Sequence, residues 1–282
     1  MSVLTIASLT LREAARRRVL AAVGALTVLA VLLTAWGMGK LAETMHARGE
    51  PAAELAATFS ILVLLLAYMF NVVLGVGAAF VAAPSIAADI DSGVVLAILP
   101  RPIRRSDLVF GKWLSLVLLA AAFTFVAGAI ELAVVRAISG YAPPHPAVAL
   151  TFLAAETVVL LTLALMLGTR LPSIAAGISA VVLFGLAWVG GIAQSIALAL
   201  HNESVIRATT ALSLLLPTDA LWRGAAYALE PAAVAAAALT DVRSESPFAV
   251  GSPPPAAFEW WAVGWVIAVL AAAVISFQRR DL

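Results

Sequence analysis

The stretch Asp89–Trp113 reads DIDSGVVLAILPRPIRRSDLVFGKW and separates two long apolar runs. It holds acidic and basic side chains, prolines and glycines, whereas the runs on either side are free of charge over most of their length. A chain that crosses a bilayer leaves such a segment in water, because a charge in hydrocarbon is costly. Membrane-protein loops that are rich in Lys and Arg face the cytoplasm. The basic residues that predict a cytoplasmic loop here are Arg101, Arg104, Arg105 and Lys112.

The composition of the whole chain indicates a membrane protein. Its 282 residues are 63% hydrophobic and 12% charged, whereas a soluble domain is about 45–50% apolar and about 25% charged. An apolar excess of this size predicts lipid as the solvent. The chain has no cysteine, which excludes disulfides, thiolate metal sites and thiol catalysis. Its richness in alanine is typical of a bacterial protein encoded by GC-rich DNA.

Six apolar runs are long enough to cross a bilayer, which takes about 20 residues of helix. Backbone polar groups in lipid must be satisfied within their own segment, so each run is expected to be helical. We therefore predict an all-α polytopic membrane protein, with residues 1–282 forming a single transmembrane domain. The short segment Arg170–Ser173 predicts a tight turn between the fourth and fifth spans. The spans are Val19–Trp36, Phe59–Ala83, Trp113–Val135, Ala147–Thr169, Ile174–Leu200 and Trp260–Phe277.

The distribution of Lys and Arg predicts the orientation. With the N-terminus inside, eleven of these residues fall in cytoplasmic segments and six fall in external ones. This asymmetry places both termini in the cytoplasm of a bacterial cell. Residues 1–18 show a helical period and carry several Arg, so we predict an amphipathic helix in the membrane interface.

The loop 84–112 is expected to contain a short helix of its own. Pro84 marks the predicted inner end of the second span, and Asp89 and Asp91 favour the start of a new helix through the helix dipole. The apolar run Val94–Leu99 would form that helix, and Pro100 would end it. A water-exposed helix this apolar needs a partner surface.

The external loop 201–259 is too short for an ordinary domain and too apolar for a linker. Ala211–Leu216 and Leu221–Leu239 predict short helices, broken by Pro217 and Pro231. We expect these helices to lie on the surface or to re-enter the membrane at the outer mouth. A seventh span is the less favoured alternative, because it would place the C-terminal Arg residues outside.

Four polar residues inside the predicted spans are candidates for a substrate path: Asn71, Glu131, Glu156 and Gln194. Charged groups at this depth usually face the protein interior or a cavity. One interpretation is a polar ring that lines the path. The alternative is structural, with Glu131 reaching toward Arg136 and Glu156 bonded to a neighbouring helix. Asn71 suits a hydrogen bond between helices better than a ligand.

Enzymatic motifs are missing from the sequence. A P-loop reads G-x-x-x-x-G-K-[ST], but Leu41 and Trp113 follow the two Gly-Lys pairs. The three histidines lie in outer loops or at span ends, which disfavours an intramembrane Ser/His site and a metal site. We therefore expect no catalytic residues, no metal and no nucleic-acid partner.

The charged stretch resembles the first cytoplasmic loop of ABC transporter permeases of the ABC-2 type. The residues that carry this resemblance are Asp89, Asp91, Gly93, Ile98, Leu99, Pro102, Arg104, Arg105, Gly111 and Lys112. The C-terminal Phe277–Leu282, the run Leu214–Arg223 and the N-terminal Leu11-Arg12-Glu13 are similar to family segments as well. The departures are Asp at 89 and 91, where the family often has Glu, and Val94, where it often has Thr.

The resemblance implies a permease subunit driven by a separate cytoplasmic ATPase, which would bind the ATP and Mg. It also implies a second permease copy, an N-terminal elbow helix, a coupling helix between the second and third spans, and export as the main direction. The implied ATPase-coupling residues are Asp89, Asp91, Gly93, Leu96, Leu99, Pro102, Arg104, Arg105, Lys112 and Arg170.

Two other function classes stay open. The first is a proton-coupled secondary transporter that uses Glu131 or Glu156. It predicts inverted repeats, and no convincing repeat relates the first three spans to the last three. The second is a membrane scaffold that transports nothing.

Overall fold

A computed structural model describes residues 3–16, 18–91, 104–231, 250 and 252–280. Within these ranges the chain is helical and has no strand. Its helices are α1 (Val3–Arg16), α2 (Arg18–Ala47), α3 (Ala52–Asp91), α5 (Arg105–Ser139), α6 (Pro146–Gly168), α7 (Ser173–Ala199), α8 (Glu203–Leu215), α9 (Thr218–Leu229) and α11 (Ala256–Gln278). Six of them, namely α2, α3, α5, α6, α7 and α11, are long and apolar enough to cross a membrane. The predictions of an all-α fold and of six spans are therefore confirmed.

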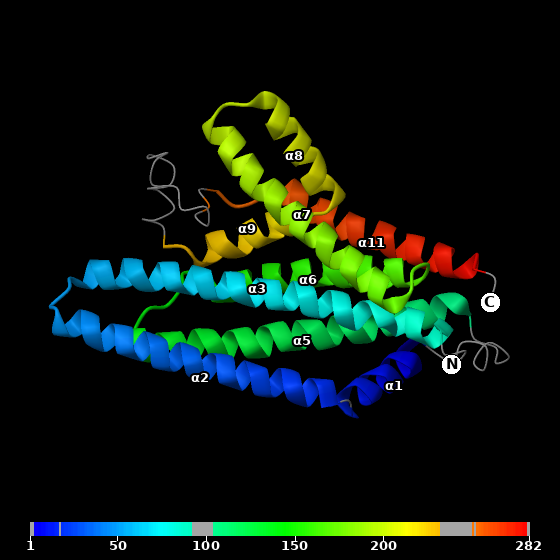
Figure 1. The fold of residues 1–282 in the computed structure, drawn as a ribbon, viewed down its shortest axis with the longest axis horizontal. Helices are drawn as coiled ribbons and strands as arrows, with labels where there is room; N and C mark the ends of the chain where they lie inside the picture. Colours follow the sequence, from blue (N-terminus) through cyan, green and yellow to red (C-terminus); the bar gives the residue numbers. More distant parts are fainter. Residues whose placement is uncertain (1–2, 17, 92–103, 232–249, 251, 281–282) are drawn as a thin grey trace.

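The long helices run up and down in one bundle. Figure 1 marks the N- and C-terminus at the same end, which we name the terminal end. The opposite end, where α2 ends and α3 begins, is the far end. Helix α6 contacts α3, α5, α7, α9 and α11, and 72% of its most apolar window is buried, against 11% for α2. Helix α6 is therefore the centre of the bundle and α2 is at its edge.

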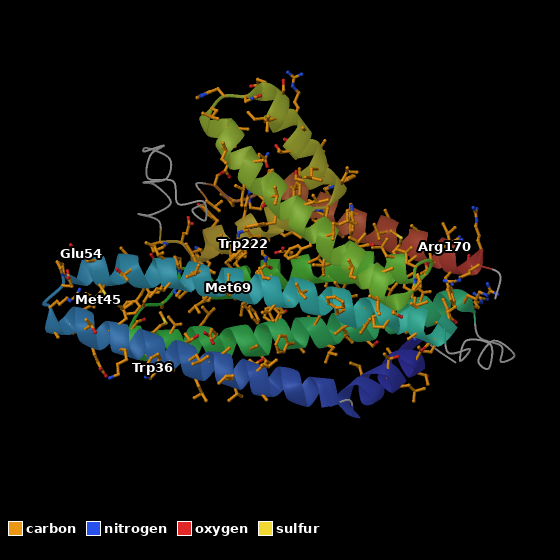
Figure 2. All side chains as sticks on the ribbon, viewed as in Figure 1. Trp36, Met45, Glu54, Met69, Arg170 and Trp222 are labelled. Carbon is orange, nitrogen blue, oxygen red and sulfur yellow. The ribbon has the colours of Figure 1, made fainter. Side chains whose placement is uncertain are left out.

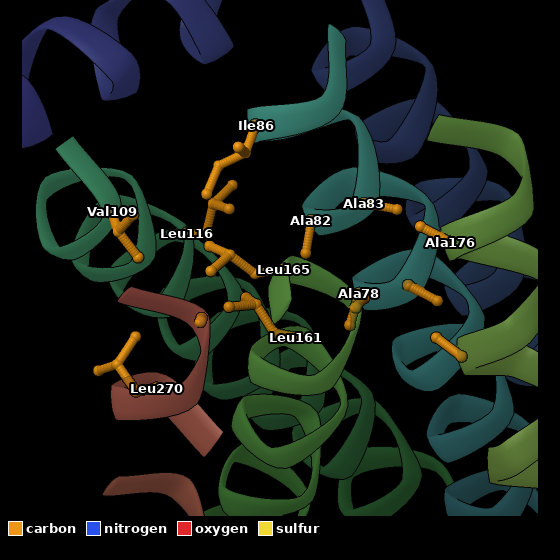
Figure 3. Packing of buried hydrophobic residues seen from close by; sticks show 14 of the residues in the cluster. Ala78, Ala82, Ala83, Ile86, Val109, Leu116, Leu161, Leu165, Ala176 and Leu270 are labelled. Carbon is orange, nitrogen blue, oxygen red and sulfur yellow. The ribbon is translucent and has the colours of Figure 1, made fainter. Parts of the chain in front are cut away.

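Small side chains bring α3 close to α6 near the terminal end. Ala78, Ala82 and Ala83 of α3 pack in one core cluster with Leu161 and Leu165 of α6 (Figure 3). Small residues at helix contacts let two backbones approach each other in membranes, where helices associate by packing. At Gly168 the approach is closest, since a Cβ atom there would lie 2.5 Å from the carbonyl oxygen of Ala83.

Helix α3 is longer than the sequence predicts. It continues through Pro84 to Asp91, so the predictions that Pro84 ends the span and that Asp89 and Asp91 begin a new helix are wrong. Proline is tolerated inside membrane helices, because neighbouring groups satisfy the freed backbone carbonyl. Asp89 therefore lies in the last turn of a long helix, and only residues 92–104 join α3 to α5.

Two other bounds differ in the same direction. Helix α2 extends past Trp36 to Ala47, and α5 begins at Arg105, well before Trp113. Hydropathy marks the lipid-facing part of each helix, whereas backbone hydrogen bonding continues into the polar flanks. The tight turn predicted between the fourth and fifth spans is present, because α6 ends at Gly168 and α7 begins at Ser173.

Helices α8 and α9 form a splayed hairpin, in which α8 packs on α7 and α9 packs on α6. The Asn202 side chain caps α8 by accepting a hydrogen bond from the Val205 N–H at 3.3 Å. At the tip of the hairpin, Leu216 and Leu221 pack with Val159 of α6, which lies about 20 Å along that helix from its far end. This packing favours the re-entrant alternative over a surface position.

The hairpin differs from the predicted helices in its bounds. Helix α8 begins eight residues before Ala211, and α9 ends at Leu229 rather than Leu239. The predicted part beyond residue 231 lies outside the described residues. On the other side of the hairpin, two α11 indoles donate to backbone carbonyls of α8: Trp261 Nε1 to Leu214 O at 3.0 Å and Trp265 Nε1 to Leu215 O at 2.8 Å.

The predicted N-terminal helix is present as α1. Its residues Ile6 and Ala7 are buried, and a Cβ atom at Gly111 of α5 would lie 2.7 Å from Ile6. Helix α1 therefore packs against α5. Its place in the membrane interface stays a prediction.

Candidate functional site

Polar side chains link the helix ends at the terminal end of the bundle. Lys112 of α5 forms an ion pair with Asp89 of α3 and also donates to the carbonyl oxygen of Ser85. Both partners lie in the last two turns of α3, which places them within reach of the first turns of α5. These contacts fix the end of α3 against the start of α5.

Arg105, the first residue of α5, closes the C-terminus of α11. Its Nη1 donates to the carbonyl oxygens of Gln278 at 3.0 Å and Arg280 at 2.9 Å, and to that of Phe277 at 3.4 Å. The last carbonyls of a helix have no partner within the helix and carry partial negative charge. A guanidinium at this point satisfies several of them at once.

The turn between α6 and α7 is tied to α11 as well. Arg170 Nε donates to Ser276 Oγ at 2.8 Å, and Arg280 Nη1 donates to Thr169 O at 2.6 Å. Thr169 Oγ1 and Ser276 Oγ share a further hydrogen bond of 2.8 Å. Figure 2 shows Arg170 at this end of the molecule. The ends of α3, α5, α6 and α11 are thus cross-linked at the terminal end.

The structure therefore brings together part of the predicted coupling set. Asp89, Arg105, Lys112 and Arg170 lie at the terminal end, but each bonds to groups of this chain. Arg104 is exposed, immediately before α5. The backbone of Asp91 ends α3. Gly93, Leu96, Leu99 and Pro102 lie outside the described residues, so the coupling role of the whole set stays a prediction.

Two of the substrate-path candidates bind each other in the centre of the bundle. Asn71 Nδ2 of α3 donates to Glu156 Oε1 of α6 at 3.2 Å, and both side chains are buried. Glu156 Oε2 has no hydrogen-bond partner among the residues that the structure describes. This is the contact between helices that the structural alternative predicts for Glu156 and Asn71.

The other two candidates lie apart from this pair. Gln194 of α7 donates to Thr210 Oγ1 of α8 at 3.4 Å. Glu131 of α5 lines a cavity of about 400 Å³ between α2, α3, α5 and α6. It forms no ion pair with Arg136 within the described chain, because residues five apart on a helix point about 140° away from each other. Among the four candidates, only Asn71 and Glu156 are hydrogen-bonded to one another.

A partly buried ion pair in α9 is absent from the sequence-based candidates. Arg223 Nε donates to Asp219 Oδ2 at 2.9 Å, and its Nη2 donates to the Gly191 carbonyl of α7 at 2.7 Å and to Ser195 Oγ at 3.3 Å. Gly191 is required here, since a Cβ atom would overlap the Asp219 carboxylate at 1.8 Å. The sequence does contain a signal for this pair: an Asp and an Arg lie four residues apart in an apolar run, and α7 carries the small pair Gly190-Gly191.

Aromatic packing supports the same region. Trp222 of α9 lies against Tyr68 of α3, with ring centroids 5.5 Å apart in an edge-to-face arrangement. Tyr68 also lies 5.9 Å from Trp188 of α7. Figure 2 labels Trp222, which sits where α9 crosses α3. Helices α3, α7 and α9 thereby meet around one aromatic cluster.

The far end of α9 is fixed by hydrogen bonds to the α5–α6 connection. Tyr141 Oη donates to Leu229 O at 3.2 Å, and the His145 N–H donates to Ala228 O at 3.0 Å. Burial raises the pKa of Tyr141 to about 12, with a further contribution from the charge of Glu230.

Glu230 follows α9 directly and binds a distant part of the chain. Its carboxylate accepts from the Val250 N–H at 3.0 and 3.2 Å. Burial raises the pKa of Glu230 to about 7, while the hydrogen bond from Val250 acts in the opposite direction. The carboxyl therefore titrates near neutral pH.

Comparison with known families identifies the architecture. The family model of the ABC-2 family transporter protein matches residues 4–282, which is nearly the entire chain. The chain belongs to the ABC-2 transporter family. As a member, it is a multi-pass membrane protein with a permease role in transport. No curated protein matches the chain.

Proposed function

We propose that this ABC-2 protein is the membrane-spanning subunit of an ATP-driven exporter in the bacterial cytoplasmic membrane. It would work beside a second permease copy, with both termini in the cytoplasm. A separate ATPase subunit would bind ATP and Mg and would dock at the terminal end. The chain itself would catalyse no reaction.

The cross-linked helix ends at the terminal end support this proposal. Lys112–Asp89 joins α5 to α3, Arg105 joins α5 to α11, and Arg170 joins the α6–α7 turn to α11. A partner that pushed on the connection between α3 and α5 would therefore move four helix ends together. Packed helices respond to such a push by discrete repacking rather than by continuous bending.

Movement at the terminal end would reach the opposite side of the membrane through α6. This helix contacts α3 and α9 along its length, and α9 carries the re-entrant hairpin toward the far end. A tilt of α3 and α6 would shift the hairpin relative to α7, to which it is held by Arg223. The hairpin would thus act as the outer gate of the exporter.

The docking site can be tested with two arginines of one helix. Arg104 is exposed immediately before α5, and Arg136 is exposed near its other end. Arg104→Glu reverses a charge at the rim of the proposed ATPase contact, so it should weaken co-purification of the ATPase and lower its activity in the complex by about tenfold or more. Arg136→Glu, at the far end, should leave both unchanged.

The measurements are pull-down of a co-expressed ABC ATPase subunit and ATP hydrolysis by the reconstituted complex. If both arginine variants behave alike, the ATPase does not dock at the terminal end. If the chain alone transports substrate on a pH gradient, and ATP depletion has no effect, it is a proton-coupled transporter instead.

A further inference from the structure

An apolar cavity of about 400 Å³ lies at the edge of the bundle, between α2 and the three helices α3, α5 and α6. Its walls include Val31 and Thr34 of α2, Met69 and Val73 of α3, and Leu150 of α6. Met69, labelled in Figure 2, and Val73 are 50% and 60% exposed, so the cavity is continuous with the outer surface of α3. A volume in this range is typical of sites for small molecules, which span about 300–1,000 Å³.

The cavity exists because α2 leaves α3 below their contact at the far end. There, Met38 and Ala42 of α2 pack with Phe59 and Val63 of α3. Helix α2 also contacts α5, and in Figure 1 it moves away from both α3 and α5 toward the terminal end. The helices that diverge leave a space that runs along the bundle, with Leu26 at one end and Val135 at the other.

Glu131 is the charged residue in the cavity wall. It lies eight residues before the last residue of α5, which is about 12 Å along the helix. No ion pair or hydrogen bond of the described chain satisfies its carboxylate, in contrast to Glu156, which accepts from Asn71. Charged residues within membrane-spanning segments are rare and usually face a partner, a cavity or a functional path.

We propose that this cavity binds an amphipathic cation, a molecule with an apolar body and one positively charged group that pairs with Glu131. The apolar walls would hold the body, and the carboxylate would select the charge. The identification of this molecule as cargo rests on the proposed export function, whereas its binding to the cavity does not depend on that function.

Another occupant fits this cavity less well. A plain acyl chain from the bilayer would fill the apolar space but would leave Glu131 unmatched in hydrocarbon.

A second cavity, of about 650 Å³, lies between α6, α9 and α11 and also has one glutamate, Glu259. Glu259 is exposed in the first turn of α11, where its charge can be stabilised by the helix N-terminus. That cavity therefore needs no cation.

The test uses two ions of nearly the same shape and opposite charge, tetraphenylphosphonium and tetraphenylborate. The full chain would be placed in phosphatidylcholine nanodiscs, and binding would be measured by equilibrium dialysis against empty discs. The wild type should prefer the phosphonium. Glu131→Gln should weaken phosphonium binding by about tenfold or more, whereas Glu131→Asp should retain most of it. Glu43→Gln and Glu259→Gln should bind like the wild type.

A folding defect in Glu131→Gln would be detected by its unfolding temperature and its elution volume. The wild type supplies an independent measurement, because a ligand that binds the native state raises the unfolding temperature. The phosphonium should raise it and the borate should not. Equal binding of the two ions, or loss of selectivity in Glu259→Gln but not in Glu131→Gln, would overturn the proposal.

The outcome is separable from that of the proposed function. Dialysis needs neither ATP nor an ATPase. Charge-selective binding in a chain that has no ATPase partner would leave the cation site standing and refute the exporter. An ATP-driven exporter without charge-selective binding would refute the cation site alone.

Discussion

The regions around α6 and α2 are built from helices of similar apolarity but differ in how they are held. The mean hydropathy of the most apolar window is 2.2 in α6 and 1.6 in α2, yet 72% of the first and only 11% of the second is buried. The central region, α6 with α3, α7 and α9, holds Glu156 and Asp219 by hydrogen bonds from Asn71 and Arg223, although Glu156 Oε2 and Thr218 Oγ1 have no partner among the described residues. The peripheral region, α2 with the cavity beside it, offers Glu131 no partner among the described residues. Burial and hydrogen bonds between helices, rather than apolarity, distinguish the centre of this bundle from its edge.

The largest expected difference concerns two ion pairs within single helices. Arg223–Asp219 of α9 has side chains only 26% and 9% exposed, whereas Lys40–Glu43 of α2 has side chains 62% and 69% exposed. Arg223→Gln leaves a buried carboxylate and the Gly191 carbonyl without their donor, so it should destabilise the protein by about 3 kcal/mol or more. Lys40→Gln should change stability by less than about 0.5 kcal/mol.

Tryptophan fluorescence during thermal unfolding in detergent measures both variants, since the chain has 7 tryptophans. Similar unfolding temperatures for Arg223→Gln and Lys40→Gln would mean that α9 is not held in the centre by this pair. The proposed difference in stability between the central and the peripheral region would then lose its main support.

The architecture of the spans was predictable because lipid imposes a simple rule on sequence. A membrane helix needs a long apolar run, and runs such as Ala147–Thr169 and Trp260–Phe277 coincide closely with α6 and α11. Pro84 misled the prediction because the rule for water-exposed helices does not hold inside a bundle, where a missing hydrogen bond can be tolerated. Asp89 and Lys112 were predicted as ATPase-coupling residues, which stays a prediction; their pairing with each other depends on where α3 ends, which the local sequence does not show.

The site was less predictable than the fold, because it depends on which helices meet. Glu131 and Glu156 look alike in sequence, each a single acid in an apolar run, and only the placement of Asn71 and α2 separates them. Arg223 was counted among external loop charges because the hairpin was not placed in depth. The hairpin's depth depends on packing against Val159 and Gly191, which are distant in sequence.

A second test compares the two intramembrane glutamates directly. Asn71→Leu removes the donor to Glu156 Oε1 and should destabilise the protein by about 1–2 kcal/mol, because a buried acceptor is left without a hydrogen bond. Glu156→Gln retains an acceptor for Asn71 and should be nearly silent. Glu131→Gln removes no hydrogen bond of the described chain and should stay within about 0.5 kcal/mol of the wild type.

A double-mutant cycle sharpens this test. If Asn71 and Glu156 act as a pair, the loss in the double variant Asn71→Leu/Glu156→Leu should be smaller than the sum of the two single losses. Additive losses would contradict the pairing. A strong loss in Glu156→Gln would show that the charge itself matters, which would favour a proton site.

The last comparison is a pH dependence confined to the central region. The pKa of Glu230 is raised to about 7 in the folded protein, mainly by burial at the end of α9, against 4.5 ordinarily. Between these two values the native state binds more protons than the unfolded state, so the free energy of unfolding decreases as pH rises through this window and is level on either side.

The wild type should therefore unfold at a higher temperature at pH 5 than at pH 8. Glu230→Gln should reduce this difference, because its amide does not titrate and can still accept from the Val250 N–H. Glu43→Gln, on exposed α2, should show the full wild-type difference. An unchanged pH profile in Glu230→Gln would mean that the Glu230 carboxyl does not titrate in this range. The two regions would then differ in packing but not in their response to pH.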